Sequence, residues 1–552
     1  MAVDSGDSAQ RIAASGERPR NDPLTLKFRS ILAAGRPANL CGKWFSPHRN
    51  WGLAGFYPMC PSESSNRACP RKFSRRRLWG FRVTAILLAM LPWMIAEVAL
   101  RATGWPPTTE LEDPFIGFDS TSPLFTLDSG SQQYVTADNR LVYFRPQRFS
   151  AHKNSNEVRI FVLGGSTVQG RPYEVETAFS TWLQLALETA DPSRQWTVVN
   201  CGGVSYASYR LVALVDEILS YEPDLLILCT GNNEFLESRS YESYLEQPLW
   251  LRKFSGWTRQ LATVRAVQKL LAPADRQVTE KLPTEVDAQL DYKDALETYQ
   301  RDDAWSQAVY DHFRRSLERI AFQAKAAKVP VWLVLPPTNY RDCPPFKSGV
   351  LNHESSAEAE LIRTLQEGWY DRPLSQRKTL LESFLSEEPR YALAHYWLGR
   401  CYDEENDYEN AAQAYAKAMN EDLCPLRATG TTSAILQQMA QKQRWKLVDA
   451  PQQLAQQCPG GILDQTVLED HVHPTIEGHQ TIGKALFDLA TEHWGIPREG
   501  NSEVEIEAVF QTHFQSLPSA YFQRGRDRLQ ALNLWARGRA IGAKNREDDA
   551  SD

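Results

Sequence analysis

The chain has 552 residues, of which 42% are hydrophobic and 11% aromatic, enough to build a sizeable core in two or three domains. Its formal net charge of −7 gives no basic footprint over the whole chain, which disfavours nucleic acid as a partner. Nine scattered cysteines without a C-x-x-C pair argue against both a disulfide framework and a zinc cage.

The first 70 residues form a segment of biased composition. They are rich in Ser, Pro, Gly, Arg and Asn and show no sustained hydrophobic periodicity. Such a segment cannot bury enough apolar surface to fold, so we expect it to be disordered. One alternative stays open. If translation starts later, for example at Met59, these residues are not made and the apolar run after them becomes a signal peptide.

This apolar run extends from Val83 to Leu100 and lies between Arg82 and Arg101. At about 1.5 Å per residue a helix of this length spans roughly 27 Å, close to the hydrocarbon thickness of a bilayer. The stretch "RKFSRRRLWGFR" before the run holds six Lys or Arg residues, whereas none follows Arg101 until Arg140. The positive-inside rule therefore predicts a single membrane helix with a cytoplasmic N-terminus and an exported remainder.

Residues 157–340 alternate between apolar runs and amphipathic stretches. Four runs have the composition of buried strands: "EVRIFVLGGST", "WTVVNCGG", "DLLILCTGNNE" and "VPVWLVLPPTNY". The stretches between them, at 179–190, 210–222 and 305–328, have helical periodicity. Strands that are apolar throughout and alternate with helices predict a parallel sheet covered on both faces. Ligands bind at the carboxyl ends of the strands in such sheets, where the polar loops of these runs fall.

A different pattern separates this block from the end of the chain. The stretch "AHYWLGRCYDEENDYENAAQAYAKAMNEDLCP" has the spacing of a tetratricopeptide repeat, L-G-x-x-Y followed by A-x-x-x-[FY]-x-x-A, at Leu398, Gly399, Tyr402, Ala411, Tyr415 and Ala418. The preceding "RKTLLESFLSEEPRYA" is similar to the second helix of a degenerate repeat. One or two repeats cannot bury their own faces, so we expect them to pack on the parent domain as an insertion. The α/β pattern resumes with "TTSAILQQMAQKQRWKLVDAPQQL".

These observations divide the chain into seven predicted parts. They are a disordered cytoplasmic segment (1–77), a transmembrane helix (78–103), an extended lead-in with a few strands (104–157), the first part of the α/β domain (158–345), the helical insertion (346–425), the second part of the α/β domain (426–493) and a helical tail (494–552).

Ser166 is the first candidate for chemistry, because "VLGGSTVQG" places it where the first apolar run ends. Two glycines before it allow a sharp turn that projects the hydroxyl above the sheet edge, with its own N–H available to an oxyanion. The G-x-S-x-G elbow of α/β-hydrolases is absent, because Val168 stands at the position of the second glycine. The G-x-x-x-x-G-K-[ST] pattern of a phosphate-binding loop is absent too.

Three further stretches are relevant: "VVNCGGVSYAS" follows the second predicted strand, "CTGNNEF" follows the third, and "DHVH" lies near the end of the chain. A nucleophile loop, a small-residue loop, a G-x-N loop and a late Asp-x-x-His, in this order, resemble the four motif blocks of the SGNH (GDSL-like) hydrolase family. The resemblance covers residues 140–345 and 426–493 and extends to membrane-anchored bacterial members with tetratricopeptide insertions. It implies a flavodoxin-like three-layer sandwich and, for the exported part, a periplasmic location at the bacterial inner membrane.

The resemblance also implies roles for individual residues. Ser166 would be the nucleophile, His473 the general base and Asp470 the residue that orients the imidazole. An Asp three residues before a His can bond Nδ1–H within one loop and leave Nε2 for a serine hydroxyl, whatever the family. The oxyanion hole would consist of the N–H groups of Ser166 and Ser205 and the side-chain amide of Asn233.

The sequence departs from the family in three places. Glu234 stands where the family usually has Asp, and the nucleophile block reads Gly-Gly-Ser-Thr where many members have Gly-Asp-Ser. In the second block Ser205 occupies a position where the family often has glycine, while Gly202 and Gly203 are displaced toward the strand. The geometry of this second loop is therefore open.

Metal binding is the alternative interpretation of the stretch "EDHVHPTIEGH". His471, His473 and His479 could offer nitrogen ligands, but no H-E-x-x-H pattern accompanies them. We therefore expect no metal and no cofactor, with His471 and His479 as structural residues.

The sequence thus predicts a membrane-anchored serine hydrolase that acts on an acyl ester, either as an esterase or as an O-acyltransferase. The substrate class would be an acylated glycan or lipid, with Tyr206, Phe235, Asn339 and Tyr340 as candidate pocket residues, since all four follow strand ends. The alternative is a catalytically inactive envelope module whose repeat-like insertion binds a protein partner.

Overall fold

The computed structural model describes residues 75–103, 113, 115–118, 122–241, 245, 261–271, 281–351, 356–497, 502–539 and 543–544. Of the segment 1–77, which we predict to be disordered, residues 1–74 lie outside the described residues and residues 75–77 belong to the first helix.

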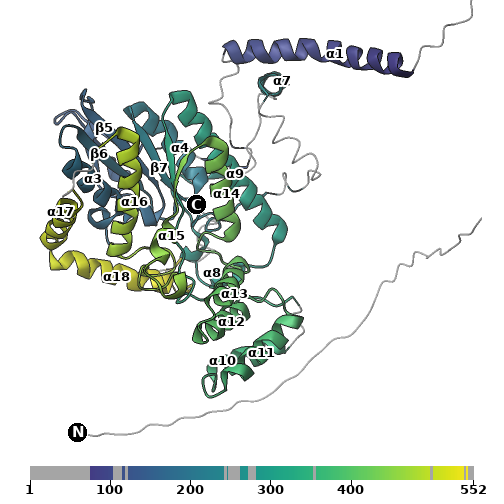
Figure 1. The fold of residues 1–552 in the computed structure, drawn as a ribbon, viewed down its shortest axis with the longest axis vertical. Helices are drawn as coiled ribbons and strands as arrows, with labels where there is room; N and C mark the ends of the chain where they lie inside the picture. The colour runs from purple at the N-terminus through teal and green to yellow at the C-terminus, as the bar shows by residue number, and fades with distance from the viewer. Residues whose placement is uncertain are drawn as a thin grey trace, which may run out of the picture. The chain divides into compact units, whose positions relative to one another are not determined.

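Five parallel strands form the central sheet (Figure 1). They are β5 (Glu157–Gly164), β6 (Gln195–Gly202), β7 (Leu225–Cys229), β9 (Val331–Val334) and β10 (Lys446–Val448). Their order is β10-β9-β7-β5-β6, and every neighbouring pair is parallel. Counted along the chain this is the flavodoxin-like order, in which the topology reverses beside the first strand. The predicted α/β fold with a parallel sheet is confirmed.

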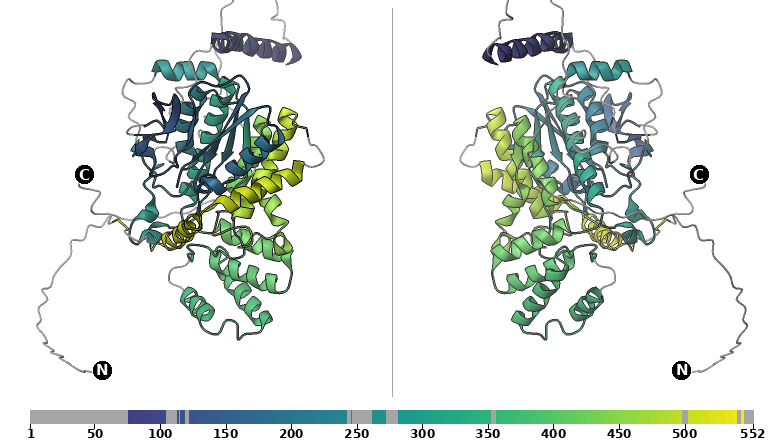
Figure 2. Two further views of the ribbon diagram at one scale, coloured as in Figure 1. Left: turned by 90° about the vertical axis from the view of Figure 1, so that its left-hand side faces the viewer. Right: turned by 90° about the vertical axis from the view of Figure 1, so that its right-hand side faces the viewer.

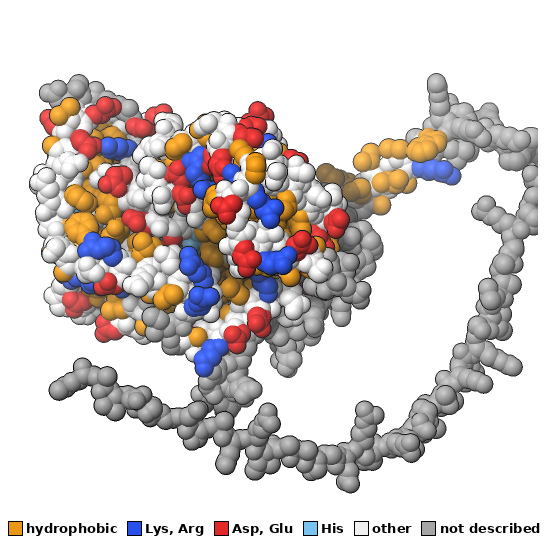
Figure 3. All heavy atoms as spheres, turned by 90° about the horizontal axis from the view of Figure 1, so that it is seen from below, with side chains coloured by type: hydrophobic (Ala, Val, Ile, Leu, Met, Phe, Trp, Pro, Cys, Tyr) orange, Lys and Arg blue, Asp and Glu red, His pale blue; other side chains and the backbone are white. Residues whose placement is uncertain are grey.

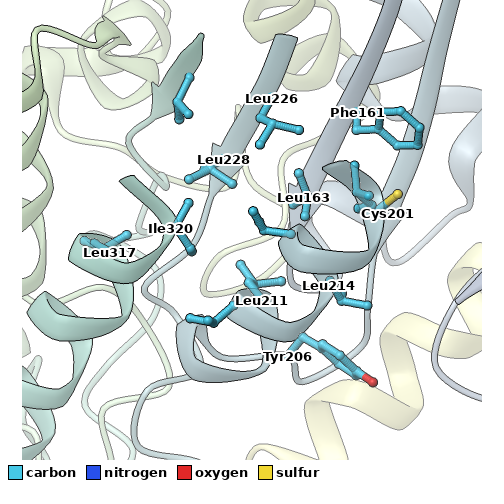
Figure 4. Packing of buried hydrophobic residues seen from close by; sticks show 14 of the residues in the cluster. Phe161, Leu163, Cys201, Tyr206, Leu211, Leu214, Leu226, Leu228, Leu317 and Ile320 are labelled. Atoms are coloured by element: carbon cyan, nitrogen blue, oxygen red, sulfur yellow. The ribbon is translucent and has the colours of Figure 1, made fainter. Parts of the chain in front are cut away.

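Side chains from alternate positions of each strand enter two separate cores. Phe161 and Leu163 of β5 point to one face and Ile160 and Val162 to the other. Because both faces are buried, the central positions of these strands are mostly apolar on both faces, which explains the apolar runs in the sequence. Figure 4 shows the first of these cores, with Leu226 and Leu228 of β7 beside the β5 side chains.

Helices cover both faces of the sheet. The first core includes side chains of α4 (Ser208–Ile218), α9 (Asp303–Ala327) and α14 (Gly430–Gln443). The second includes side chains of α3 (Phe179–Ala190), α15 (Ala450–Ala455), α16 (Ile476–Trp494) and α17 (Ser502–Ser516). Shorter helices are η2 (Asp138–Arg140), α2 (Ser166–Gln169), η3 (Val175–Thr177), η4 (Leu219–Tyr221), η5 (Gln289–Asp291), α8 (Ala295–Thr298) and η6 (Pro459–Gly461).

The lead-in to the sheet holds a small antiparallel sheet of β2 (Phe125–Asp128), β3 (Gln133–Thr136) and β4 (Arg148–Ser150). A separate parallel pair joins β1 (Gly117–Phe118) to β8 (Lys281–Leu282). Glu217 of α4 fixes the start of β2, because its carboxylate accepts hydrogen bonds from the N–H groups of Leu124 and Phe125.

The helix α1 (Arg75–Thr103) is apolar, and its segment Phe81–Thr103 is long enough to cross a bilayer and is not buried against the rest of the protein. Arg101 Nε donates to Glu97 Oε1 at 2.6 Å near its end. The Glu97 carboxylate also accepts hydrogen bonds from the N–H groups of Ala262 and Thr263, both at 2.9 Å, at the start of α7 (Ala262–Leu271). The membrane span and its orientation stay predictions.

Four helices lie between β9 and α14 as a group apart from the sheet (Figure 2). They are α10 (Ala357–Gln366), α11 (Leu374–Glu387), α12 (Ala392–Glu404) and α13 (Tyr408–Asn420). Gly399 lets α12 approach α13, since a Cβ at this position would lie 2.8 Å from the Tyr415 ring. Arg341 joins this group to the α/β part by binding Asp403 at 2.6 Å and Asp464 at 2.7 Å. The assignment of these helices as tetratricopeptide repeats stays a prediction.

The C-terminal helices pack on the α/β part. Phe510 of α17 lies against Trp182 of α3, with ring centroids 4.8 Å apart. The following helix α18 (Ser519–Trp535) begins near Tyr173, where a Cβ on Gly525 would meet the tyrosine ring. Its last residue, Trp535, donates from Nε1 to Asp291 at 2.8 Å. Because Tyr173 follows α2 and Asp291 precedes α9, α18 runs along the carboxyl end of the sheet (Figure 1).

Candidate active site

Ser166 lies at the carboxyl end of β5, as the first residue of α2. The two glycines before it are sterically required. A Cβ on Gly164 would clash with the carbonyl oxygen of Cys229, and one on Gly165 would clash with Nδ2 of Asn233. The glycine pair therefore allows β7 and the loop after it to approach the serine closely.

Three predicted residues form one continuous hydrogen-bond chain. Ser166 Oγ lies 2.7 Å from His473 Nε2, and His473 Nδ1 lies 2.7 Å from Asp470 Oδ2. Asp470 and His473 are 8% and 2% exposed, so water does not compete with their contact. In this arrangement Nδ1–H donates to the carboxylate and Nε2 accepts from the serine hydroxyl, as proton removal from Ser166 requires.

Backbone N–H groups of the loop between β10 and α16 orient Asp470 independently of the His473 imidazole. Asp470 Oδ1 accepts hydrogen bonds from the N–H groups of Val472 at 2.8 Å and His473 at 2.9 Å. Burial by itself raises the pKa of Asp470, but the neighbouring His473 and His471 and these N–H donors hold that pKa well below its ordinary value. The carboxylate is therefore ionised at neutral pH.

Donors for an oxyanion surround Ser166. The N–H of Ser166 has no acceptor within α2, because it opens the helix. The Asn233 amide packs against Gly165 and uses one Nδ2 hydrogen on the carbonyl oxygen of Tyr206 at 3.0 Å, which leaves the other free. The N–H of Ser205 makes no hydrogen bond within the described part of the chain.

Ser205 adopts a left-handed backbone conformation, with φ +62°. This conformation favours glycine, so it gives a physical reason for glycine at the equivalent position of the family that the sequence resembles. The loop before it is held by Gly203 N, which donates to the carbonyl oxygen of Gly164 at 3.0 Å, and by Val204 N, which donates to that of Tyr143 at 2.9 Å.

The other two histidines of the late stretch are buried structural residues in this geometry. His471 packs edge-on to Phe346, and burial lowers its pKa to about 4. His479 on α16 accepts the N–H of Phe179 at Nδ1, and burial lowers its pKa to about 3. No group of three metal-ligating side chains occurs among the residues that the structure describes.

The four candidate pocket residues are mostly interior. Tyr206, Phe235 and Asn339 are 2%, 4% and 3% exposed, and Tyr340 is partly exposed. Tyr206 accepts a hydrogen bond from Arg140 at its hydroxyl, and Phe235 packs against Trp305 and Tyr310. Asn339 supports the catalytic loop, because its N–H donates to the carbonyl oxygen of His471 at 3.0 Å. A role in substrate contact stays a prediction for all four.

Sequence reasoning missed two residues that support the site. Asn232, beside the predicted oxyanion residue, donates to Thr167 Oγ1 at 3.3 Å and accepts the N–H of Ala428 at 3.0 Å. Glu234 accepts hydrogen bonds from the N–H and hydroxyl of Ser208, both at 2.9 Å, so it fixes the start of α4. Their position directly around Asn233 was a signal, but their partners lie too far along the chain to be read from sequence.

The fold and the site together define an α/β protein with a Ser-His-Asp hydrogen-bond chain at the carboxyl edge of a parallel sheet. This constellation can perform acyl transfer, in which a serine attacks a carbonyl while donors stabilise the resulting oxyanion.

No family model and no curated protein matches this chain. Among solved structures, the chain is similar to a protein of the G-D-S-L family from Desulfitobacterium hafniense DCB-2, with 11% identity, 60% of this chain and 99% of the other covered, and a TM-score of 0.27. The acetyl xylan esterase AlAXEase gives 12% identity, 60% and 99% coverage and a TM-score of 0.28. The acetylxylan esterase Axe2 from Geobacillus stearothermophilus gives 12%, 60% and 93%, and 0.27. At these scores the similarities establish neither fold nor activity, so the function of the chain has to be inferred from the geometry of its site.

Proposed function

We propose that this chain is a serine-dependent ester hydrolase, or an O-acyltransferase of the same mechanism, that acts on an acyl ester. One observation carries the proposal: the unbroken path from Asp470 through His473 to Ser166 Oγ, with both contacts at 2.7 Å. Free donors at the same sheet edge support it, since a nucleophile without an oxyanion hole would lack most of its catalytic power.

In the proposed mechanism, Ser166 Oγ attacks the acyl carbonyl carbon while His473 Nε2 takes the hydroxyl proton. The carbonyl oxygen becomes an oxyanion, which accepts hydrogen bonds from the N–H groups of Ser166 and Ser205 and from the Asn233 amide. When the carbonyl reforms, the bond to the alcohol breaks and His473 gives its proton to the leaving oxygen. A water molecule then repeats the sequence on the acyl-serine and releases the acid, or another hydroxyl does so and accepts the acyl group.

Labelling with a fluorophosphonate probe tests the nucleophile directly. The full-length wild type should be labelled and should hydrolyse 4-nitrophenyl acetate, and Ser166→Ala should lose both properties. Ser131→Ala, in the exposed turn between β2 and β3, removes a distant serine and should behave as wild type. Full activity or undiminished labelling of Ser166→Ala would exclude this mechanism.

The proposal includes anchoring by α1, with the catalytic domain on the periplasmic side of a bacterial inner membrane. The apolar segment Phe81–Thr103 and the arginines before it support this arrangement. Protease added to sealed spheroplasts should digest the part of the chain after residue 104. Protection of that part would contradict the proposed orientation.

A second candidate function is an inactive module that binds a protein partner through the helical insertion. Two observations favour it: the close contact of Gly399 with Tyr415, which the repeat pattern pairs, and a groove of about 680 Å³ along α11, α12 and α13. The same labelling experiment discriminates between the candidates, because labelling that depends on Ser166 is incompatible with an inactive domain.

A further inference from the structure

Two arginines contact one carboxylate beside the catalytic loops, and a third arginine lies three residues before it in the chain. Glu174 is in ion-pair contact with Arg528 of α18 and lies 3.6 Å from Arg145 Nε. Arg171 precedes Glu174 by three residues, and its pKa is lowered to about 10, first by burial and then by the charges of Arg145 and Arg528. We refer to Arg145, Arg171 and Arg528 as the arginine cluster. Glu174 neutralises only part of its charge, and Glu176 acts on Arg145 more weakly.

The arginine cluster is joined to three of the four loops of the candidate site. Arg171 N donates to the carbonyl oxygen of Ser166 at 3.1 Å, and Arg171 Nε donates to Gln169 Oε1 at 3.0 Å. Gln169 Nε2 in turn donates to the carbonyl oxygen of Gly202, the last residue of β6 before the loop that carries Ser205. Arg171 therefore lies directly after the short helix that begins with the nucleophile.

The third connection leads to the histidine loop. Tyr173, two residues after Arg171, donates from its hydroxyl to Glu469 at 3.3 Å, and Glu469 N donates to the carbonyl oxygen of His473 at 2.8 Å.

The arginine cluster has donors that the protein leaves unused. Arg171 is partly exposed, and no hydrogen bond or ion pair of its two terminal nitrogens occurs in the described ranges. Arg145 Nε is buried and has no hydrogen-bond partner, since its contact with Glu174 is too long for one. A guanidinium with free, aligned donors is suited to bind a carboxylate or phosphate.

The charge of α18 and of the residues after it also favours an anionic ligand. Between residues 524 and 539 the chain has five arginines and one aspartate, although its overall net charge is −7. Lys and Arg side chains, with Asp and Glu side chains among them, surround the recessed middle of the face seen from below in Figure 3. A local excess of positive charge beside a catalytic site attracts anionic substrates and raises their local concentration.

From these contacts we propose that the arginine cluster is a substrate subsite, which binds a carboxylate or phosphate group carried by the ester. This inference rests on the proposed function and names the substrate class of the same site: anionic acyl esters are preferred over neutral ones.

Matched aryl acetates test the proposal on the full-length protein. 4-Acetoxybenzoate and 4-acetoxyphenyl phosphate carry the two anions, and 4-acetoxybenzamide is their neutral counterpart. Arg171→Gln should lower kcat/KM for at least one anionic ester by about 10-fold, the usual effect of losing one hydrogen bond to a charged group. The value of kcat/KM for the neutral ester 4-acetoxybenzamide should not change. The anionic ester that loses more identifies the preferred group. Arg171→Lys should restore part of the loss, because lysine keeps the positive charge but cannot donate two parallel hydrogen bonds as a guanidinium does.

Arg363→Gln on α10 is the matched control, because it removes the same charge from an exposed position of the insertion. It should leave all three values of kcat/KM unchanged. Inorganic phosphate at constant ionic strength should compete with the benzoate ester in the wild type, which is seen as a higher apparent KM, and should compete less well in Arg171→Gln.

Equal effects of Arg171→Gln on anionic and neutral esters, or no effect on either, would overturn the subsite and leave the proposed function intact. A wild type that hydrolyses neither these esters nor 4-nitrophenyl acetate would instead overturn the proposed function itself.

Discussion

Ser166 and His473 are 307 positions apart in the chain, yet Ser166 Oγ and His473 Nε2 lie 2.7 Å from each other. The parallel sheet explains this meeting. β5 delivers Ser166 to the carboxyl edge, and the loop after β10 and α15 returns to the same edge with His473 already oriented by Asp470. Activity should therefore depend on this contact and on the groups that hold it in place.

Asp470→Asn should lower kcat by a factor on the order of 10² to 10⁴ while the protein stays folded. The asparagine oxygen can still accept the N–H groups of Val472 and His473, so the loop keeps its shape. The amide nitrogen, however, faces His473 Nδ1 and forces the tautomer whose Nε2 carries a proton. Kinetics with 4-nitrophenyl acetate, together with circular dichroism, check this prediction. An Asn variant with wild-type kcat would show that Asp470 does not orient the base.

Asn233→Ala and Asn232→Ala should have different consequences, although the residues are adjacent. Loss of the Asn233 amide removes a donor to the oxyanion, so kcat should fall by about 10² to 10³ with little change in KM. Asn232 is buried and joins Thr167 to Ala428 N, so its loss should lower the free energy of unfolding by about 1 to 3 kcal/mol.

Steady-state kinetics and urea unfolding on both variants separate these two effects. If Asn233→Ala lost stability but kept kcat, the amide would be structural and the assignment to the oxyanion hole would be wrong.

Ser205→Gly should stabilise the protein by about 0.5 to 1 kcal/mol and keep its activity, because glycine adopts φ +62° without steric cost. Ser205→Ala should also keep kcat within a factor of about 3, since the proposed contribution is the backbone N–H. Lys328→Gly is a matched control, as this residue ends α9 at φ +60° far from the site. It should raise stability similarly and leave kinetics unchanged. A large loss of kcat in Ser205→Ala would assign a role to the hydroxyl instead.

The fold was predictable because strands buried on both faces leave a strong mark on the sequence. Continuous apolar runs such as that of β5 can serve only a covered parallel sheet, and parallel strands must bring their carboxyl ends to one edge. For this reason the loops with Ser166 and Asn233 could be placed at one edge from the sequence, whereas His473 was assigned to the same site through the resemblance to SGNH hydrolases. Asp470 was predictable for a local reason, since an Asp-x-x-His loop can close a hydrogen bond on itself.

Other features depend on contacts that no local pattern records. The aromatic side chains of Tyr206 and Phe235 follow strand ends, yet most of their surface is buried in the cores. The contact between Glu174 and Arg528 joins positions 354 residues apart and arises from the course of α18, whose basic residues alone gave no location. The left-handed backbone at Ser205 could not be predicted either, because a glycine in the sequence would have indicated this conformation but a serine does not.

His479 should make the folded state sensitive to acid. Burial lowers its pKa from the ordinary value of 6.5 to about 3, so the folded state holds it neutral while the unfolded state binds a proton below pH 6.5. The stability that this difference provides is complete above pH 6.5 and is lost as the pH falls toward 3. In that window one such histidine gives a slope of up to about 1.4 kcal/mol per pH unit. His471, with a pKa lowered to about 4, adds to the same slope between pH 6.5 and 4.

His479→Asn should reduce this slope, because asparagine can still accept the N–H of Phe179 but does not titrate. Urea unfolding at pH 7.5, 6.5, 5.5 and 4.5 measures the effect as the change in unfolding free energy with pH. The exposed residue His152 provides a control, since His152→Asn should leave the wild-type slope in place. An unchanged slope in His479→Asn would mean that this histidine is not held neutral by burial, and the acid sensitivity would then have to come from His471.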